Sequence, residues 1–266
     1  MAPAVLVTGA SSGIGAATAG LLARRGFQVF GTSRRPPTQP FAERVEWVEM
    51  DVRDDASVCE AVARVQAKSG GLAGLVCNAG NGIFGSVEEV SIERAREQLE
   101  TNFFGTLRTL RAVLPSLRAA ASGRLVVVGS LAGRAPIPFQ AHYSASKAAL
   151  DALVLALRNE LHGTGVWASL VEPGDVATPF NEAMLWGDPA SSAYGERLRR
   201  VERVVRESLP RAPGPETVAR AIHTALTARR PRVRYTAGAD AWRVPLGRRL
   251  LPDAWSLRLI RSHFGI

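Results

Sequence analysis

The sequence has 266 residues, of which 46% are hydrophobic, and a formal net charge of +9 at pH 7. A chain of this length and hydropathy can bury a sizeable core, which excludes a largely disordered protein. No run reaches the roughly 18 apolar residues that a spanning helix needs, and the N-terminus lacks the pattern of a secretion signal. We therefore expect a cytoplasmic protein without a membrane span.

The positive charge comes almost wholly from arginine, because Lys68 and Lys147 are the only lysines. We interpret this skew as a compositional bias, since the arginines are spread over many predicted helices rather than gathered on one. A nucleic-acid-binding protein is the rival interpretation, and we expect no nucleic-acid partner. Cys59 and Cys77 lack the spacing of a zinc site, so we expect two buried thiols and no metal.

From the N-terminus, apolar runs of strand length alternate with helical patterns. Strands are predicted at 5–7, 27–32, 45–50, 72–77, 124–128 and 166–171. Helices are predicted at 13–25, 54–68, 91–119 and 142–162. Strands that lack polar alternation and are separated by helices indicate a parallel sheet buried on both faces. The fold class is therefore α/β, a doubly wound parallel sheet of the Rossmann type.

The pattern changes after Pro173. A loop-rich stretch over 174–214 contains one charged helix near 195–208, and a helix near 215–229 and a strand near 232–236 follow. The tail mixes tryptophan and leucine with arginine. Since no repeat or domain boundary is visible, we expect a single domain over 1–266 with a C-terminal extension over 237–266.

A glycine-rich turn joins the first strand to the first helix. It reads Thr8-Gly9-Ala10-Ser11-Ser12-Gly13-Ile14-Gly15. Glycines at this place let the backbone approach a pyrophosphate, and the helix N-terminus favours its negative charge. The turn therefore predicts a dinucleotide site at the carboxyl ends of the strands, although its glycine spacing is not that of the common G-x-G-x-x-G fingerprint.

Tyr143 and Lys147 lie four residues apart at the start of a predicted helix, and so share one face. A lysine cation beside a phenol favours the phenolate, which would lower the tyrosine pKa towards neutrality. Ser130 follows the fifth strand, where a hydroxyl can hydrogen-bond a reacting oxygen. Asn102 lies inside the long predicted helix. Asparagine is a poor helix former, so its presence there suggests a specific role for its side chain.

Further pairs follow in order along the chain, and the whole set resembles the short-chain dehydrogenase/reductase family over about residues 4–179. These pairs and their neighbours are Asp51-Val52, Asn78-Ala79-Gly80, and Pro173-Gly174 with Val176 and Thr178. The Phe84-Gly85 segment and the extended tail resemble the branch that contains 17β-hydroxysteroid and retinol dehydrogenases.

The resemblance implies roles for these residues. Tyr143 is expected to exchange a proton with a carbonyl or alcohol oxygen, with Ser130 polarising that oxygen. Lys147 is expected to lower the tyrosine pKa and to bond the nicotinamide ribose. Asn102 is expected to support a water chain that returns protons to Lys147. The expected cofactor contacts are Gly9, Ser11, Ser12, Gly13, Ile14, Gly15, Arg34, Asp51, Val52, Asn78, Ala79, Gly80, Tyr143, Lys147, Pro173, Gly174, Val176 and Thr178.

The end of the second strand indicates which nicotinamide cofactor is used. An acidic residue there would bond the ribose 2′-hydroxyl of NAD, but this strand ends in Ser33-Arg34-Arg35. A guanidinium suits a 2′-phosphate, so we expect NADP(H), with Arg34 as the main contact, Ser11 assisting and Arg35 as a further candidate. Ser12 stands where some NADP-preferring relatives carry a basic residue.

The substrate region is expected over 175–214, as a lid by analogy with the family. Its aromatic and apolar side chains, with Phe84 and Phe139 opposite, suit a hydrophobic ketone, aldehyde or alcohol. We expect a homodimer or tetramer, and the tail is open between a membrane surface, the parent fold and a partner subunit. The alternative function is a regulatory protein that binds the cofactor without turnover; a sugar epimerase or dehydratase fits the short chain less well.

Overall fold

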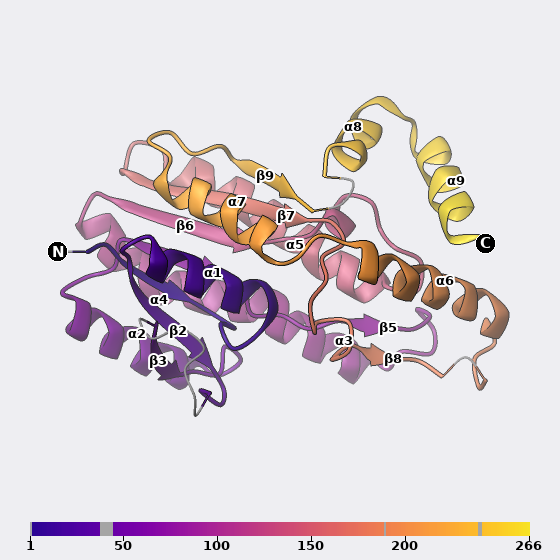
Figure 1. The fold of residues 1–266 in the computed structure, drawn as a ribbon, viewed down its shortest axis with the longest axis horizontal. Coiled ribbons are helices and arrows are strands. Elements are labelled where there is room, and N and C mark those ends of the chain that lie inside the picture. The colour runs from indigo at the N-terminus through magenta and orange to yellow at the C-terminus, as the bar shows by residue number, and fades with distance from the viewer. Residues whose placement is uncertain (1, 38–44, 189, 239–240) are drawn as a thin grey trace.

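The computed structural model describes residues 2–37, 45–188, 190–238 and 241–266. A seven-stranded, wholly parallel sheet lies between two layers of helices, with strand order β3-β2-β1-β4-β6-β7-β9 (Figure 1). Its strands are β1 Ala4–Val7, β2 Gln28–Ser33, β3 Val45–Glu49, β4 Gly74–Cys77, β6 Gly123–Val128, β7 Val166–Pro173 and β9 Arg234–Ala237. The predicted doubly wound fold class is confirmed.

The helices divide the core into two parts, one on each face of the sheet. Their bounds are α1 Gly13–Arg24, α2 Asp55–Ser69, α3 Ile92–Leu99, α4 Gly105–Ala119, α5 Ala141–Glu160, α6 Gly195–Ser208, α7 Glu216–Thr227, α8 Arg243–Leu250 and α9 Asp253–Phe264. Buried residues of α2, α4 and α5 cover one face, and those of α1 and α7 cover the other. Both faces are thereby removed from water, which explains why the strands lack polar alternation.

The position of the site follows from the strand order. The chain winds from β1 outwards through β2 to β3, and then returns to add β4 on the other side of β1. The connection after β1 therefore crosses one face of the sheet, and the connection after β4 crosses the other. The two diverge at the carboxyl ends of these strands, which is where ligands bind in open parallel sheets.

The long helix predicted over 91–119 is interrupted. The structure has α3, then a π-helical turn at Glu100–Phe104, then α4. A π turn inserts an extra residue and re-aims the side chains on it, and such turns are frequent at functional sites. Asn102 lies within this turn and is fully buried. The apolar periodicity continues across it, so the pattern indicated one helix.

A second, two-stranded sheet was not predicted. β5 Ile83–Phe84 pairs in parallel with β8 Leu185–Trp186, and each strand is too short to show alternation in sequence. Phe84 and Met184 pack there with α6 and with Phe264 of α9. The C-terminal helix is therefore fixed by one face to the region beside the site.

The expectation of two buried thiols is half wrong. Cys77 is buried in β4, but Cys59 is exposed, because its position on α2 faces away from the sheet while Val58 and Val62 face inward. In the part of the chain that the structure describes, no helix is long and apolar enough to cross a membrane.

Gly15 gives a test of the close packing at the edge of the sheet. A Cβ there would overlap the carbonyl oxygen of Gly9 and lie 2.5 Å from Nδ2 of Asn78. We expect Gly15→Ala to lower the melting temperature by roughly 5–10 °C in thermal unfolding. Gly20→Ala is the matched control, since in the same helix a Cβ meets only the end of the Arg24 side chain. The control should be neutral or slightly stabilising, and equal melting temperatures for the two variants would contradict the packing argument.

Candidate active site

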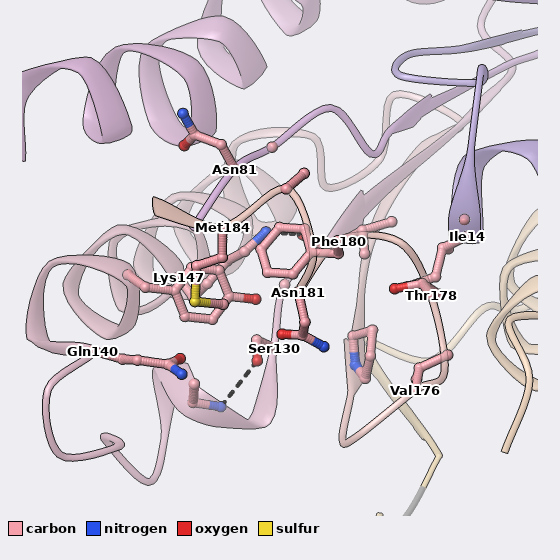
Figure 2. A pocket seen from close by; sticks show the side chains of 18 of the residues that line it. Ile14, Asn81, Ser130, Gln140, Lys147, Val176, Thr178, Phe180, Asn181 and Met184 are labelled. Carbon is pink, nitrogen blue, oxygen red and sulfur yellow. Dashed lines mark hydrogen bonds between the residues drawn. The ribbon is translucent and has the colours of Figure 1, made fainter. Parts of the chain in front are cut away.

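One cavity of about 840 Å³ opens at the carboxyl edge of the sheet, and it brings together nearly all the predicted site residues (Figure 2). Those that line it are Gly9, Ser11, Ser12, Gly13, Ile14, Arg34, Asp51, Val52, Asn78, Ala79, Gly80, Ser130, Tyr143, Lys147, Pro173, Gly174, Val176 and Thr178. Gly15 and Asn102 are absent from the lining. Both lie behind it, where they support residues that face the cavity.

The glycine turn forms a narrow cradle at one end of the cavity. Gly9 and Gly13 have φ angles of +62° and +52°, a region that glycine adopts without strain. A Cβ on Gly9 would lie 2.8 Å from Cα of Ala79, so the turn lies directly against the end of β4. Since α1 begins at Gly13, its N-terminal N–H groups border the same space. The cradle fits a pyrophosphate.

Thr8 and Asn78 fix this cradle to the sheet. The Thr8 hydroxyl accepts hydrogen bonds from the backbone N–H groups of Asn78 and Ala79 at 2.9 and 3.0 Å. In return, Nδ2 of Asn78 donates to the carbonyl oxygens of Thr8 and Gly9, both at 3.0 Å. The Asn78 amide thus shapes the turn itself. Thr8 was absent from the predicted site, although the sequence placed it at the end of the first strand.

The end of β2 carries positive charge and a hydroxyl group without a hydrogen-bond partner among the described residues. Arg34 lines the cavity, and the buried Oγ of Ser33 beside it has no hydrogen-bond partner among the described residues. Arg53, which sequence reasoning missed, also lines this end and binds Asp51 with Nη2–Oδ2 at 2.6 Å. Its hydrogen bonds lower the pKa of Asp51. Arg35 is not among the lining residues, so the structure gives it no place at the cavity.

Ser130, Tyr143 and Lys147 meet in the middle of the cavity. Ser130 caps a short 3-10 turn, Leu131–Gly133, by accepting a hydrogen bond from the N–H of Ala132 at 3.1 Å. Tyr143 and Lys147 project from the first two turns of α5, and Nζ of Lys147 lies 5.7 Å from the centre of the tyrosine ring. The same Nζ donates to the carbonyl oxygen of Val128 at 2.9 Å.

Burial shifts the pKa values of Lys147 and Tyr143. It lowers the pKa of Lys147 to about 8, because the ammonium loses its hydration. Burial also raises the pKa of Tyr143, while a hydrogen bond with Ser130 acts in the opposite direction. The lowering of the Tyr143 pKa expected from Lys147 is therefore not found in this state. The reason is that desolvation favours the neutral form of both groups.

Asn102 connects the loop after β4 to α5. Its Oδ1 accepts from the N–H of Asn81 at 2.9 Å, and its Nδ2 donates to the carbonyl of Asn81 and to Oγ of Ser146, both at 3.0 Å. Ser146 directly precedes Lys147. These bonds give Asn102 a positioning role, and the water chain expected from it stays a prediction.

A buried ion pair behind Ser130 was not predicted. Arg134 binds Glu172 through Nε and Nη2 at 2.6 and 2.5 Å, and Glu172, at the end of β7, is only 1% exposed. Arg234 approaches the same carboxylate at 3.2 Å. Burial raises the pKa of Glu172, and Arg134 opposes that shift. The pair ties the turn that carries Ser130 to the strand that leads into Pro173. A glutamate inside an apolar strand was the signal available in the sequence.

The other end of the cavity is mainly apolar. Phe180 and Met184 line it as expected, and the Phe180 ring lies 5.7 Å from that of Tyr143 (Figure 2). Phe84 and Phe139, expected on the opposite wall, pack against each other outside the lining. The reason is that the β5–β8 pairing draws Phe84 into its own cluster. The wall is completed by residues that the sequence did not indicate, namely Ile137, Gln140, Val204, Val205, Val244, Leu259, Ile260 and Phe264.

The burial of Lys147 predicts a pH dependence of stability. Its pKa falls from 10.5 when unfolded to about 8 when folded, so the unfolded chain binds more protons between these values and stability rises with pH across that window. Below pH 8 the burial of the charged Lys147 lowers the free energy of unfolding by its full amount, roughly 3 kcal/mol. Lys147→Met should therefore melt at a higher temperature than the wild type near pH 7, by a margin that shrinks towards pH 10. Lys68→Met, at the other and exposed lysine, is the control. A margin that is constant with pH would refute the argument.

Comparison with known proteins identifies the family. A family model described as short chain dehydrogenase matches residues 3–186. The chain is 38% identical over 255 residues to human 17-beta-hydroxysteroid dehydrogenase type 1, covering 87% of this chain and 76% of that protein. It is 39% identical over 178 residues to the 3-ketodihydrosphingosine reductase of Bacteroides thetaiotaomicron, covering 67% of this chain and 65% of that one. The match thus spans slightly less than two thirds of the latter protein's length.

Solved structures agree. A short-chain dehydrogenase from Streptomyces avermitilis superposes with a TM-score of 0.82 at 32% identity, covering 99% of this chain and 96% of that one. Among other structures of this fold, one is a complex with NADP and another a complex with NAD, so the fold binds a nicotinamide cofactor without selecting between the two. The protein belongs to the short-chain dehydrogenase/reductase family of oxidoreductases and resembles its hydroxysteroid dehydrogenases.

Proposed function

We propose that the protein is an NADP(H)-dependent oxidoreductase that interconverts a hydrophobic ketone or aldehyde and the corresponding alcohol, with reduction as its direction in the cell. The observation that carries this proposal is the meeting of Ser130, Tyr143 and Lys147 in one cavity whose far end is bordered by Arg34. A proton donor and a site for a phosphorylated dinucleotide are thereby joined by a continuous space.

In this proposal Tyr143 gives its phenolic proton to the substrate oxygen during reduction, and takes it back during oxidation. Ser130 donates a hydrogen bond to the same oxygen as negative charge develops on it. Lys147, with its pKa of about 8, is able to gain or lose a proton near neutrality and so to restore the proton of Tyr143. The nicotinamide, when bound, supplies the hydride.

The preference for NADP(H) rests on the end of β2. Arg34 lies beside Ser33, whose hydroxyl has no hydrogen-bond partner among the described residues, and Asp51, a carboxylate that lines the same cavity, is held by Arg53. A 2′-phosphate would meet two guanidinium groups and a hydroxyl donor here. Ser11, which lines the same cavity, is within the proposed contact set.

The substrate proposal rests on the apolar end of the cavity. Phe180, Met184 and Leu259 offer little hydrogen bonding, which suits a lipophilic body with its carbonyl turned towards Tyr143. A 17-beta-hydroxysteroid dehydrogenase and a 3-ketodihydrosphingosine reductase among the relatives are consistent with such a substrate. We propose that 175–214 acts as the substrate lid.

We also propose a cytoplasmic single-domain protein that assembles as a homodimer or tetramer through its long helices. Phe104 beside α4 and Leu155 on α5 are 44% and 40% exposed, an apolar pair that an interface would cover.

Replacing Tyr143 by Phe tests the proposed proton donor. The variant keeps the ring and loses the hydroxyl, so kcat for ketone reduction should fall by about 10³-fold or more while NADPH binding changes little. The assay is NADPH oxidation with steroid, retinoid and aliphatic ketones, beside direct cofactor titration. Tyr194→Phe, at an exposed tyrosine, is the control. Wild-type protein that binds NADPH yet turns over no carbonyl would favour the regulatory alternative.

Replacing Arg34 by Ala tests the cofactor preference. KM for NADPH should rise roughly 10–100-fold with KM for NADH little changed, because only the former carries the 2′-phosphate. Arg35→Ala is the matched control, since Arg35 does not line the cavity. If wild-type protein prefers NADH, or if both variants behave alike, the assignment of Arg34 is wrong.

A further inference from the structure

The C-terminal helices carry an unusual share of the exposed apolar surface. Twelve large apolar side chains are exposed among the described residues, and six of them lie between 242 and 259. We call these six the tail surface: Trp242, Leu246, Leu250, Trp255, Leu257 and Leu259, which are 47–69% exposed. Figure 1 shows α8 and α9 at one end of the molecule, outside the helical layers that cover the sheet.

This exposure follows from how the two helices are fixed. On α9, Ser256, Ile260 and Phe264 lie four residues apart and form the inward face, with Phe264 in the cluster that includes Leu198 of α6. The residues flanking that face are left to solvent. Trp242, at the N-cap of α8, repeats at the same spacing with Leu246 and Leu250 of that helix, so the three share one face, and all three are exposed.

The charge of the segment that carries the tail surface is mainly positive. Residues 241–266 contain five arginines, and Asp253 is their only acidic residue. Arg243 and Arg249 flank the apolar face of α8 on either side, as their helical positions require. Helices that lie in the interface of an anionic membrane combine tryptophan and leucine on one face with arginine beside it, as this segment does. Arginines near such a surface are attracted to its anionic headgroups.

We propose that the tail surface docks on an anionic lipid bilayer. A second copy of the chain is the other obvious cover for apolar side chains. A two-fold interface, however, would set the same patch against itself and bring arginines of the two copies together. Repulsion of like charges disfavours that arrangement, whereas phosphate headgroups satisfy the arginines while the leucines and tryptophans enter the acyl boundary.

The tail surface also adjoins the cavity. Leu259 belongs to it and lines the cavity, together with Val244 of α8 and Ile260 and Phe264 of α9. A bilayer docked on these helices would therefore lie next to the apolar end of the site. Docking itself stands independently of the proposed function, because it depends only on the surface.

Vesicle co-sedimentation of the full chain tests the proposal. We expect binding to phosphatidylcholine vesicles that contain phosphatidylglycerol to be about tenfold or more tighter than to phosphatidylcholine alone, and to weaken as salt is raised. Leu246→Glu with Leu250→Glu should abolish retention. Val87→Glu with Ile92→Glu makes the same change at apolar side chains outside the tail surface that are 68% and 62% exposed, against 47% and 68% for Leu246 and Leu250, and should bind like the wild type. Arg249→Glu with Arg258→Glu should remove the preference for phosphatidylglycerol.

Several results would overturn the proposal. One is wild-type protein that stays in the supernatant with anionic vesicles. Another is equal retention of the α8 variant and its control, with both shown to be folded by their melting curves. A third is a dimer in sedimentation velocity that is lost only in the α8 variant, since a second copy would then cover the tail surface. Because none of these readouts uses catalysis, a failure of the proposed activity would be seen separately.

Discussion

The site depends on the amide of Asn102. This side chain is fully buried and makes three hydrogen bonds, two with the backbone of Asn81 and one with Oγ of Ser146. It therefore joins the end of β4 to the first turns of α5, which carry Tyr143 and Lys147. A buried amide left unpaired costs about 1–3 kcal/mol, so the two segments cannot separate without a penalty. The π turn around Asn102 is the local irregularity that aims the amide at both partners.

The glycine turn and the Arg134–Glu172 ion pair are likewise held by polar side chains, on the two sides of the group formed by Ser130, Tyr143 and Lys147. Asn78 and Thr8 bind the turn to the end of β4, and Arg134 with Glu172 binds the Ser130 turn to the end of β7. Each connection includes one polar side chain that is removed from water, Thr8 in the first and Glu172 in the second, which makes the arrangement specific. The glycine turn and the turn that carries Ser130 are thus each fixed to a strand end of the sheet.

The sequence predicted the fold and the centre of the site because both leave local marks. Apolar strand runs specify a parallel sheet, and the ends of those strands must meet at one edge, so Gly9, Ser130 and Tyr143 could be placed together without coordinates. Partners that are distant in sequence left no such mark. Folding alone brings Asn81 to Asn102, and Arg134 to Glu172. The pKa of Tyr143 was misjudged for a related reason, since burial depends on every element packed around it.

The structure of the cavity also explains why the type of reaction is easier to infer from the sequence than the identity of the substrate. Its polar end is built by consecutive strand ends of one sheet, whose geometry is set by the fold. Its apolar end is assembled from Ile137, Phe180, Val204 and Leu259, which come from four separate segments. Small changes in any one segment alter the shape of that end without disturbing the sheet. The β5–β8 pairing is an example, because two short strands suffice to withdraw Phe84 from the wall where its sequence position had suggested it. In the proposed function, substrate choice would therefore depend on packing between segments, whereas proton transfer would depend on residues placed at the sheet edge.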